Sequence, residues 1–97
     1  MIRESQYQAR LIDSIRKRFP DCIVLKNDAN YIQGFPDLTI LFKDRWAALE
    51  VKRSVGASHQ PNQDYYIQKL NAMSYAAFIC PENEEEVLNE IQQAFGV

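Results

Sequence analysis

Residues 34–52 read GFPDLTILFKDRWAALEVK and contain two short runs typical of β-strands, at 38–42 and 46–52. Both runs are rich in aliphatic and aromatic residues, which favour a pleated and partly buried surface. The KDR sequence at 43–45 separates them and suits a hairpin turn. The stretch therefore predicts two neighbouring strands around which the rest of the domain is built.

Three charged residues stand at the ends of these two strands. Asp37 precedes the first strand, and Glu50 and Lys52 close the second. Side chains two positions apart share one face of a strand, so Glu50 and Lys52 are expected side by side. If the strands pair through the turn, Asp37 lies beside them, because neighbouring strands are about 4.8 Å apart.

The remaining segments predict a single α/β domain spanning residues 1–97. An α-β-β-β-α-β-α order, with a central mixed sheet flanked by helices, is the arrangement that these segments favour. In order, we expect a helix at 4–19, a strand at 22–26, the two strands above, a helix that has Pro61 in its first turn and Asn62 as N-cap, a strand at 75–80, and a helix from about 83.

Two of the expected helices carry an apolar stripe with a polar residue at its N-terminal end. At 100° per residue, Glu4 and Gln8 project into the first stripe, and Gln63 lies along the second. The stripes consist of Tyr7, Leu11, Ile12, Ile15 and Phe19 in the first helix and Tyr66, Ile67, Leu70 and Met73 in the second. Polar side chains in these places point to a shared site at the sheet.

Composition narrows the class of protein. With 97 residues and 46% hydrophobic content, the chain forms a small core that dimerisation would enlarge. No apolar run is long enough to span a bilayer and no signal-peptide core opens the chain, so we expect a cytoplasmic protein without membrane contact. Cys22 and Cys80 lie in strand-like runs and are expected to be buried thiols.

Charge is unevenly distributed along the chain. The net charge is −2, but all eleven basic residues fall within residues 1–80, together with eight of the thirteen acidic residues. This distribution is compatible with a phosphate-binding face. The chain has no Ser-His-Asp or Cys-His set, no P-loop and no dinucleotide fingerprint, so no small-molecule cofactor is expected. The lone histidine, His59, is expected to be an exposed loop residue.

A buried pair of carboxylates predicts a bound cation. Asp37 and Glu50 would repel one another and lose hydration inside a sheet unless a divalent ion lay between them. Oxygen ligands favour Mg²⁺, with Mn²⁺ as the alternative. A hard cation beside Lys52 suits phosphodiester hydrolysis. Glu4 would be a third carboxylate at this site, and Gln63 would bind a phosphate oxygen or the attacking water.

With these residues in place, the chain resembles the PD-(D/E)xK nuclease superfamily. The closer resemblance is to its virus-type replication-repair nuclease (VRR-NUC) family, whose motifs occur here in the same order. They are a glutamate in the first helix, Glu4; the Gly-x-Pro-Asp run, Gly34 to Asp37; the Glu-Val-Lys run, Glu50 to Lys52; and a glutamine opening a helix, Gln63. One departure is Ser74, where members of the family often carry a glycine.

The resemblance implies a restriction-endonuclease-like core and a set of site residues. Asp37, Glu50 and the main-chain carbonyl of Val51 would hold the metal, with Glu4 completing the acidic set. Lys52 would serve the attacking water, and Gln63 would support the site. The implied reaction is metal-dependent hydrolysis of DNA phosphodiesters that leaves 5′-phosphates.

The resemblance also implies a substrate and an assembly. Small members of the family that stand alone resemble dimeric resolvases that cut four-way (Holliday) junctions in recombination and repair, so a phage- or prophage-encoded homodimer is expected. Candidate DNA contacts are Arg3, Lys26, Lys43, Arg45 and Arg53, and the strand layout predicts that they cluster near the site. Tyr31 and Phe35 are candidates for packing on a base or sugar.

Three other readings of the sequence remain open at this point. A monomeric nickase or flap endonuclease would use the same residues on other branched DNA. A catalytically inactive DNA-binding module would keep the fold but make no product. A structural protein in which the motif is coincidental would gain no stability from Mg²⁺.

Overall fold

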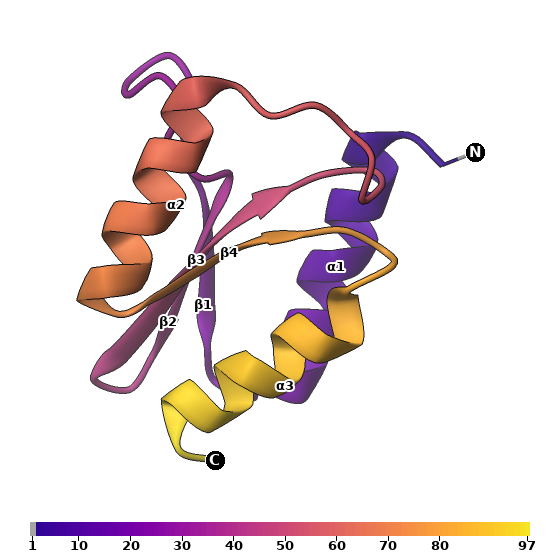
Figure 1. The fold of residues 1–97 in the computed structure, drawn as a ribbon. Helices are drawn as coiled ribbons and strands as arrows, with labels where there is room; N and C mark the ends of the chain where they lie inside the picture. Colours follow the sequence, from indigo (N-terminus) through magenta and orange to yellow (C-terminus); the bar gives the residue numbers. More distant parts are fainter. Residues whose placement is uncertain (1) are drawn as a thin grey trace.

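Residues 2–97 are described by a computed structural model, in which the elements follow the α-β-β-β-α-β-α order expected from the sequence (Figure 1). The sheet has the order β1-β2-β3-β4; β1–β2 and β2–β3 pair antiparallel, and β3–β4 pair parallel. The elements are α1 (Glu4–Arg18), β1 (Ile23–Lys26), β2 (Leu38–Phe42), β3 (Arg45–Val51), α2 (Pro61–Met73), β4 (Tyr75–Ile79) and α3 (Glu84–Phe95). The prediction of a central mixed sheet flanked by helices is confirmed.

The helices lie on both faces of the sheet, with α1 and α3 on one side and α2 on the other (Figure 1). The larger core lies under α1 and α3, where the apolar stripe of α1 meets alternate residues of β2 and β3. Its side chains include Tyr7, Leu11, Ile15 and Phe19 of α1, Leu38 and Ile40 of β2, Leu49 and Val51 of β3, and Val87, Leu88, Ile91 and Phe95 of α3. The predicted stripe of α1 is therefore confirmed.

The core under α2 is smaller, and two expectations for that helix are wrong. Leu70 is the only buried residue of α2, and Met73 is 66% exposed, because α2 packs on the small side chains of Ala48 and Ala76. The N-cap is Gln60 instead of Asn62, since Pro61, which has no N–H, occupies the first helical position.

The two cysteines are free thiols in different surroundings. Cys80 is buried as expected, whereas Cys22 is only half-buried because it lies beside the edge strand β1. Two apolar side chains of that edge strand, Ile23 and Leu25, are 56% and 44% exposed. None of the helices within residues 2–97 is long and apolar enough to cross a membrane.

Candidate active site

The pairing of β2 with β3 brings Asp37 next to Glu50. Leu38 lies opposite Leu49, so the next position in the antiparallel register places Asp37 across from Glu50. The Oδ2 atom of Asp37 accepts a hydrogen bond of 2.9 Å from the main-chain N–H of Val51. This contact fixes one predicted carboxylate at the end of β3, as the strand pattern had indicated.

Glu50 is almost completely buried, with only 4% of its surface exposed. Burial first, and then the charge and hydrogen bonding of neighbouring Asp37, raise the pKa of its carboxyl group to about 8, although the nearby Lys52 ammonium acts to lower it. Glu4 is close enough for its charge to act in the same direction. The site therefore has more negative charge than its own lysine neutralises, and an added cation would favour the ionised form of Glu50.

Lys52 and Gln63 complete the cluster from β3's end and from α2. The Nζ atom of Lys52 donates to Oε1 of Gln63 at 2.9 Å and lies 3.9 Å from Oε2 of Glu50. The Nε2 atom of Gln63 donates to the same Glu50 oxygen at 3.1 Å. Lys52 is only 9% exposed and Glu50 only 4%. The side-chain amide of Gln63 therefore links a buried ammonium group to a buried carboxyl group.

The place of Gln63 follows from the start of α2. It is the third residue of the helix, and its Oε1 atom also accepts a hydrogen bond from the main-chain N–H of Gln60, the N-cap. Its amide is thus held by three partners, Gln60, Lys52 and Glu50. These contacts orient Lys52 and Glu50, in line with the supporting role that the resemblance implied, whereas they occupy the amide that would otherwise bind a phosphate oxygen or water.

Sequence reasoning missed Asn27, which holds the Pro-Asp turn in place. Its Nδ2 atom donates to the carbonyl of Pro36 at 2.8 Å and to Oγ1 of Thr39 at 2.9 Å, while its main-chain N–H donates to the carbonyl of Asp37 at 2.8 Å. An asparagine after a strand is ordinary in turns, so the sequence offered no specific signal for this role.

Gly34 allows the loop before Asp37 to pass close to α2. It has φ of +85°, and an added Cβ would overlap the side chain of Asn62 and lie 2.8 Å from that residue's carbonyl carbon. We expect Gly34→Ala to lower the free energy of unfolding by about 2 kcal/mol, because alanine is strained at positive φ and the neighbour is helix backbone.

The matched control for this substitution is Gly56→Ala, since an added Cβ there meets no atom within 4 Å. Urea denaturation of both variants measures the effect, and we expect only Gly34→Ala to shift the midpoint substantially. Equal midpoints for the two variants would show that the loop tolerates a side chain beside α2.

Glu4 lies at the first position of α1, one turn before Tyr7 on the same helical face, and is exposed because it stands at the end of the helix. The buried part of the stripe begins one turn later, at Tyr7, and Gln8 is half-buried. The negative charge of Glu4 helps to raise the pKa of Glu50, so Glu4 acts on the site through its charge.

The candidate DNA contacts do not form one cluster, which corrects the expectation. Lys43 and Arg45 lie at the β2–β3 turn. Arg45 is five residues along β3 from Glu50, which corresponds to about 17 Å. The strand layout puts this turn at the opposite end of the hairpin from Asp37. Lys26, which pairs with Leu38, and Arg53, which follows Lys52, lie at the same end as the site, and Arg3 precedes Glu4.

His59 is partly exposed on the loop before α2, as expected, but its ring is held in place. It stacks on Phe78 with the ring centroids 3.8 Å apart, and its Nδ1 atom lies 3.1 Å from Oδ1 of Asp64. Phe78 is paired with Glu50 across β3 and β4. The imidazole therefore lies on the strand next to the carboxylates.

The residues at the site fit a magnesium ion better than a metal that needs many protein ligands. Within residues 2–97, no three His, Cys, Asp or Glu side chains converge as a ready cation site. Mg²⁺ keeps several waters and is commonly held by one or two carboxylates together with substrate phosphates. Asp37 and Glu50 supply two carboxylates, and the Val51 carbonyl leaves its extended strand on the same side as the N–H that contacts Asp37.

Comparisons of the chain with protein-family models, with curated proteins and with solved structures give no significant match.

Proposed function

We propose that this protein is a metal-dependent endonuclease that hydrolyses DNA phosphodiesters, in the manner of the VRR-NUC family of PD-(D/E)xK nucleases. The observation that carries the proposal is the cluster of buried Glu50 and Lys52 with half-buried Asp37 and Gln63. A cluster of this kind is costly in a purely structural sheet, because buried charges that are incompletely paired destabilise the fold. Strongly perturbed carboxyl groups are more frequent at functional sites.

Each side chain has a role that its position supports. Asp37, fixed by the Val51 N–H, and Glu50, ionised in the working enzyme, would hold Mg²⁺ or Mn²⁺ with the Val51 carbonyl, and Glu4 would act through its charge. The bound ion would supply charge neutralisation at the scissile phosphate. Lys52 would hold the attacking water and stabilise negative charge on the phosphate in the transition state.

Gln63 positions Lys52 and Glu50 relative to one another, as its two hydrogen bonds to them indicate. Three basic residues near the site, Arg3, Lys26 and Arg53, are exposed and available to the DNA backbone. Backbone contacts of this kind fix the register of a nucleic acid without reading its sequence. Selectivity would then come from the shape of the DNA.

Branched DNA is the substrate that we propose, with a four-way junction first among the branched forms and a homodimer as the active species. Paired cuts across a junction need two such clusters, and because each chain of 97 residues carries one, a resolvase of this kind would act as a homodimer. A cytoplasmic, phage- or prophage-encoded resolvase would fit this description. A monomeric flap endonuclease or nickase would use the same cluster on one strand.

Cleavage of a labelled four-way junction and a matched linear duplex in Mg²⁺ tests the proposal. We expect wild-type protein to cut the junction, Asp37→Asn to cut it at least about 100-fold more slowly, and Asp13→Asn, an exposed change on α1, to behave as wild type. Sedimentation of the same samples reports whether the active species is a dimer.

The other outcomes separate the remaining functions. Cutting of flaps in place of junctions by a monomer would assign a structure-specific nuclease or nickase. DNA binding without a product in Mg²⁺ or Mn²⁺ would assign a catalytically inactive binding module. Absence of both DNA binding and cleavage would leave the cluster without a nucleic-acid function.

A further inference from the structure

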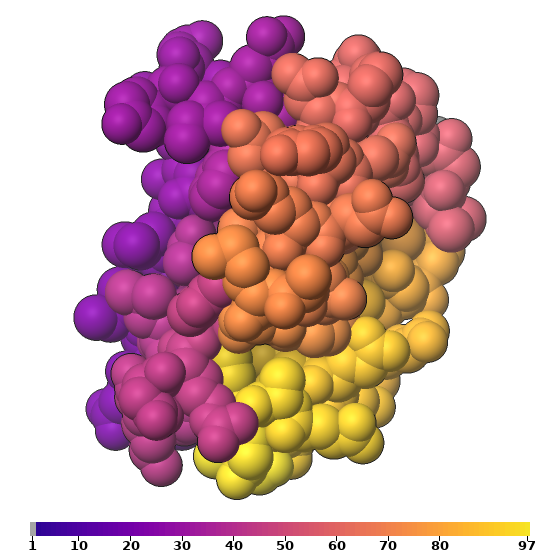
Figure 2. All heavy atoms as spheres, turned by 60° about the vertical axis from the view of Figure 1, so that its left-hand side comes forward, coloured from indigo at the N-terminus to yellow at the C-terminus, as the bar shows by residue number. Residues whose placement is uncertain are grey.

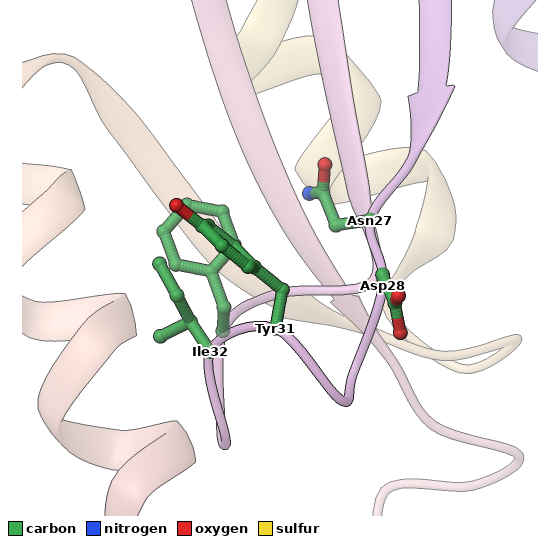
Figure 3. Close-up of a pocket in the computed structure, with 5 residues that line it drawn as sticks. Asn27, Asp28, Tyr31 and Ile32 are labelled. Carbon is green, nitrogen blue, oxygen red and sulfur yellow. The ribbon is translucent and has the colours of Figure 1, made fainter.

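A cavity of about 440 Å³ lies in the loop between β1 and β2, next to the candidate active site. Asn27, Asp28, Tyr31, Ile32 and Phe35 line it, and Figure 3 shows Asn27 and Asp28 on one arm of the loop and Tyr31 and Ile32 on the other. The volume falls within the roughly 300–1,000 Å³ range of small-ligand pockets. In Figure 2 this loop projects as a lobe beside the N-terminal part of α2.

One aromatic wall of the cavity is fixed and the other is open to solvent. The Phe35 ring meets Tyr66 of α2 edge to face, with centroids 5.5 Å apart, and packs against the core under α2. Tyr31 is 85% exposed, the highest exposure of any large apolar or aromatic side chain in residues 2–97. The exposed Tyr31 ring therefore offers a free face on which a flat ring can stack, while Phe35 anchors the loop on α2.

The polar groups of the cavity accept hydrogen bonds and carry negative charge. Asn27 uses its Nδ2 atom to hold Pro36 and Thr39, which leaves Oδ1 as an acceptor. One carboxylate oxygen of Asp28 accepts from the main-chain N–H of Asn30, and the second oxygen remains for a ligand. No lysine or arginine lines the cavity, so it disfavours a phosphate and suits a neutral ring with an amino group.

The cavity is joined to the catalytic cluster through Asn27. The side chain of this residue holds the Pro36 carbonyl, and its main-chain N–H donates to the Asp37 carbonyl at 2.8 Å. A nucleotide bound in the cavity would therefore lie next to the Pro36–Asp37 segment that leads into β2. A base paired within a duplex is inaccessible to such a pocket, so the occupant has to be unpaired.

We propose that this cavity binds one unpaired nucleobase carrying an exocyclic amino group, stacked on Tyr31, on the strand that enters the active site. The proposal rests on the proposed nuclease function and adds that the preferred DNA has an unpaired nucleotide beside the cut. Stacking on one aromatic side chain corresponds to roughly 5- to 100-fold in binding. Adenine, cytosine and guanine carry exocyclic amino donors that match the acceptors of Asn27 and Asp28, whereas thymine has no amino group and only a ring N–H donor.

The test uses a duplex with a single-stranded arm whose first unpaired base is 2-aminopurine, bound in EDTA so that no cleavage occurs. We expect wild-type protein to quench the fluorescence and Tyr31→Ala to lose the quenching and bind at least about 5-fold more weakly. Tyr31→Phe should retain both effects. Tyr65→Ala, which removes a tyrosine that is 55% exposed on α2 and outside the cavity, is the matched control.

A second arm of the experiment replaces the 2-aminopurine by an abasic site. Removal of the base should weaken binding to wild type and leave the affinity of Tyr31→Ala unchanged, since that variant has already lost the stacking contact. Equal quenching by wild type and Tyr31→Ala, or no binding by wild type, would overturn the proposed pocket. Quenching that depends on Tyr31 without cleavage in Mg²⁺ would support the pocket and reject the nuclease, whereas cleavage without such quenching would do the reverse.

Discussion

Replacing Lys52 by alanine is expected to slow DNA cleavage by a factor of about 100 to 1,000 while the protein still binds DNA. Removing one donor that stabilises charge in a transition state has an effect of this size. The expectation is specific to this lysine because the residue is only 9% exposed and its ammonium group is held between Gln63 and the Glu50 carboxylate. Single-turnover cleavage with enzyme in excess measures the chemical step without contributions from product release.

Two further variants serve as controls for Lys52→Ala. Lys52→Met keeps the buried aliphatic stem and removes only the charge, so its melting temperature should stay closer to that of wild type while its activity falls equally. Lys17→Ala removes an exposed lysine in the last turn of α1, away from the site, and should leave the rate unchanged. Cleavage by Lys52→Met at a rate near wild type would mean that the ammonium has no part in the reaction.

The strand pairing and the position of the carboxylates could be predicted from residues 34–52 alone. The alternation of side chains predicts which residues share a face, but the turn has two residues, Lys43 and Asp44, one fewer than the KDR turn expected from the sequence. Arg45 pairs with Phe42, and this pairing sets the register that places Asp37 across from Glu50. Asp37, Glu50 and Lys52 meet because of this period of two. The buried stripe of α1 could also be predicted, because Tyr7, Leu11 and Ile15 recur at helical spacing.

Contacts between distant segments could not be predicted from local patterns. The three hydrogen bonds of the Gln63 amide depend on where α2 lies over β3, which no periodicity reports. The prediction that Lys43 and Arg45 cluster with the other basic residues was wrong, because they lie at the turn of the β2–β3 hairpin and the site lies at its opposite end. The exposure of Glu4 could not be predicted, because a helical projection does not say where burial along the helix begins.

Glu50→Gln is expected to raise the free energy of unfolding of the metal-free protein at pH 9 by at least about 2 kcal/mol, with loss of cleavage. In the folded wild type, burial and Asp37 raise the pKa of this carboxyl group to about 8, against an ordinary value of 4.5. Each unit of such a difference corresponds to about 1.4 kcal/mol. The folded state keeps a proton that the unfolded state releases, so the stability present below pH 4.5 is lost as the pH rises to about 8.

Urea denaturation in EDTA between pH 5 and 9 measures this dependence directly. Wild type should lose stability across the range, Glu50→Gln should lack that component, and Glu86→Gln, an exposed change on α3, should follow wild type. Added Mg²⁺ should stabilise wild type most at the alkaline end, where a cation replaces the missing proton, and should stabilise Glu50→Gln little. A Glu50→Gln variant that is less stable than wild type at pH 9 would mean that Lys52 and Gln63 already compensate the buried charge, and the main physical reason for placing a cation beside Glu50 would be lost.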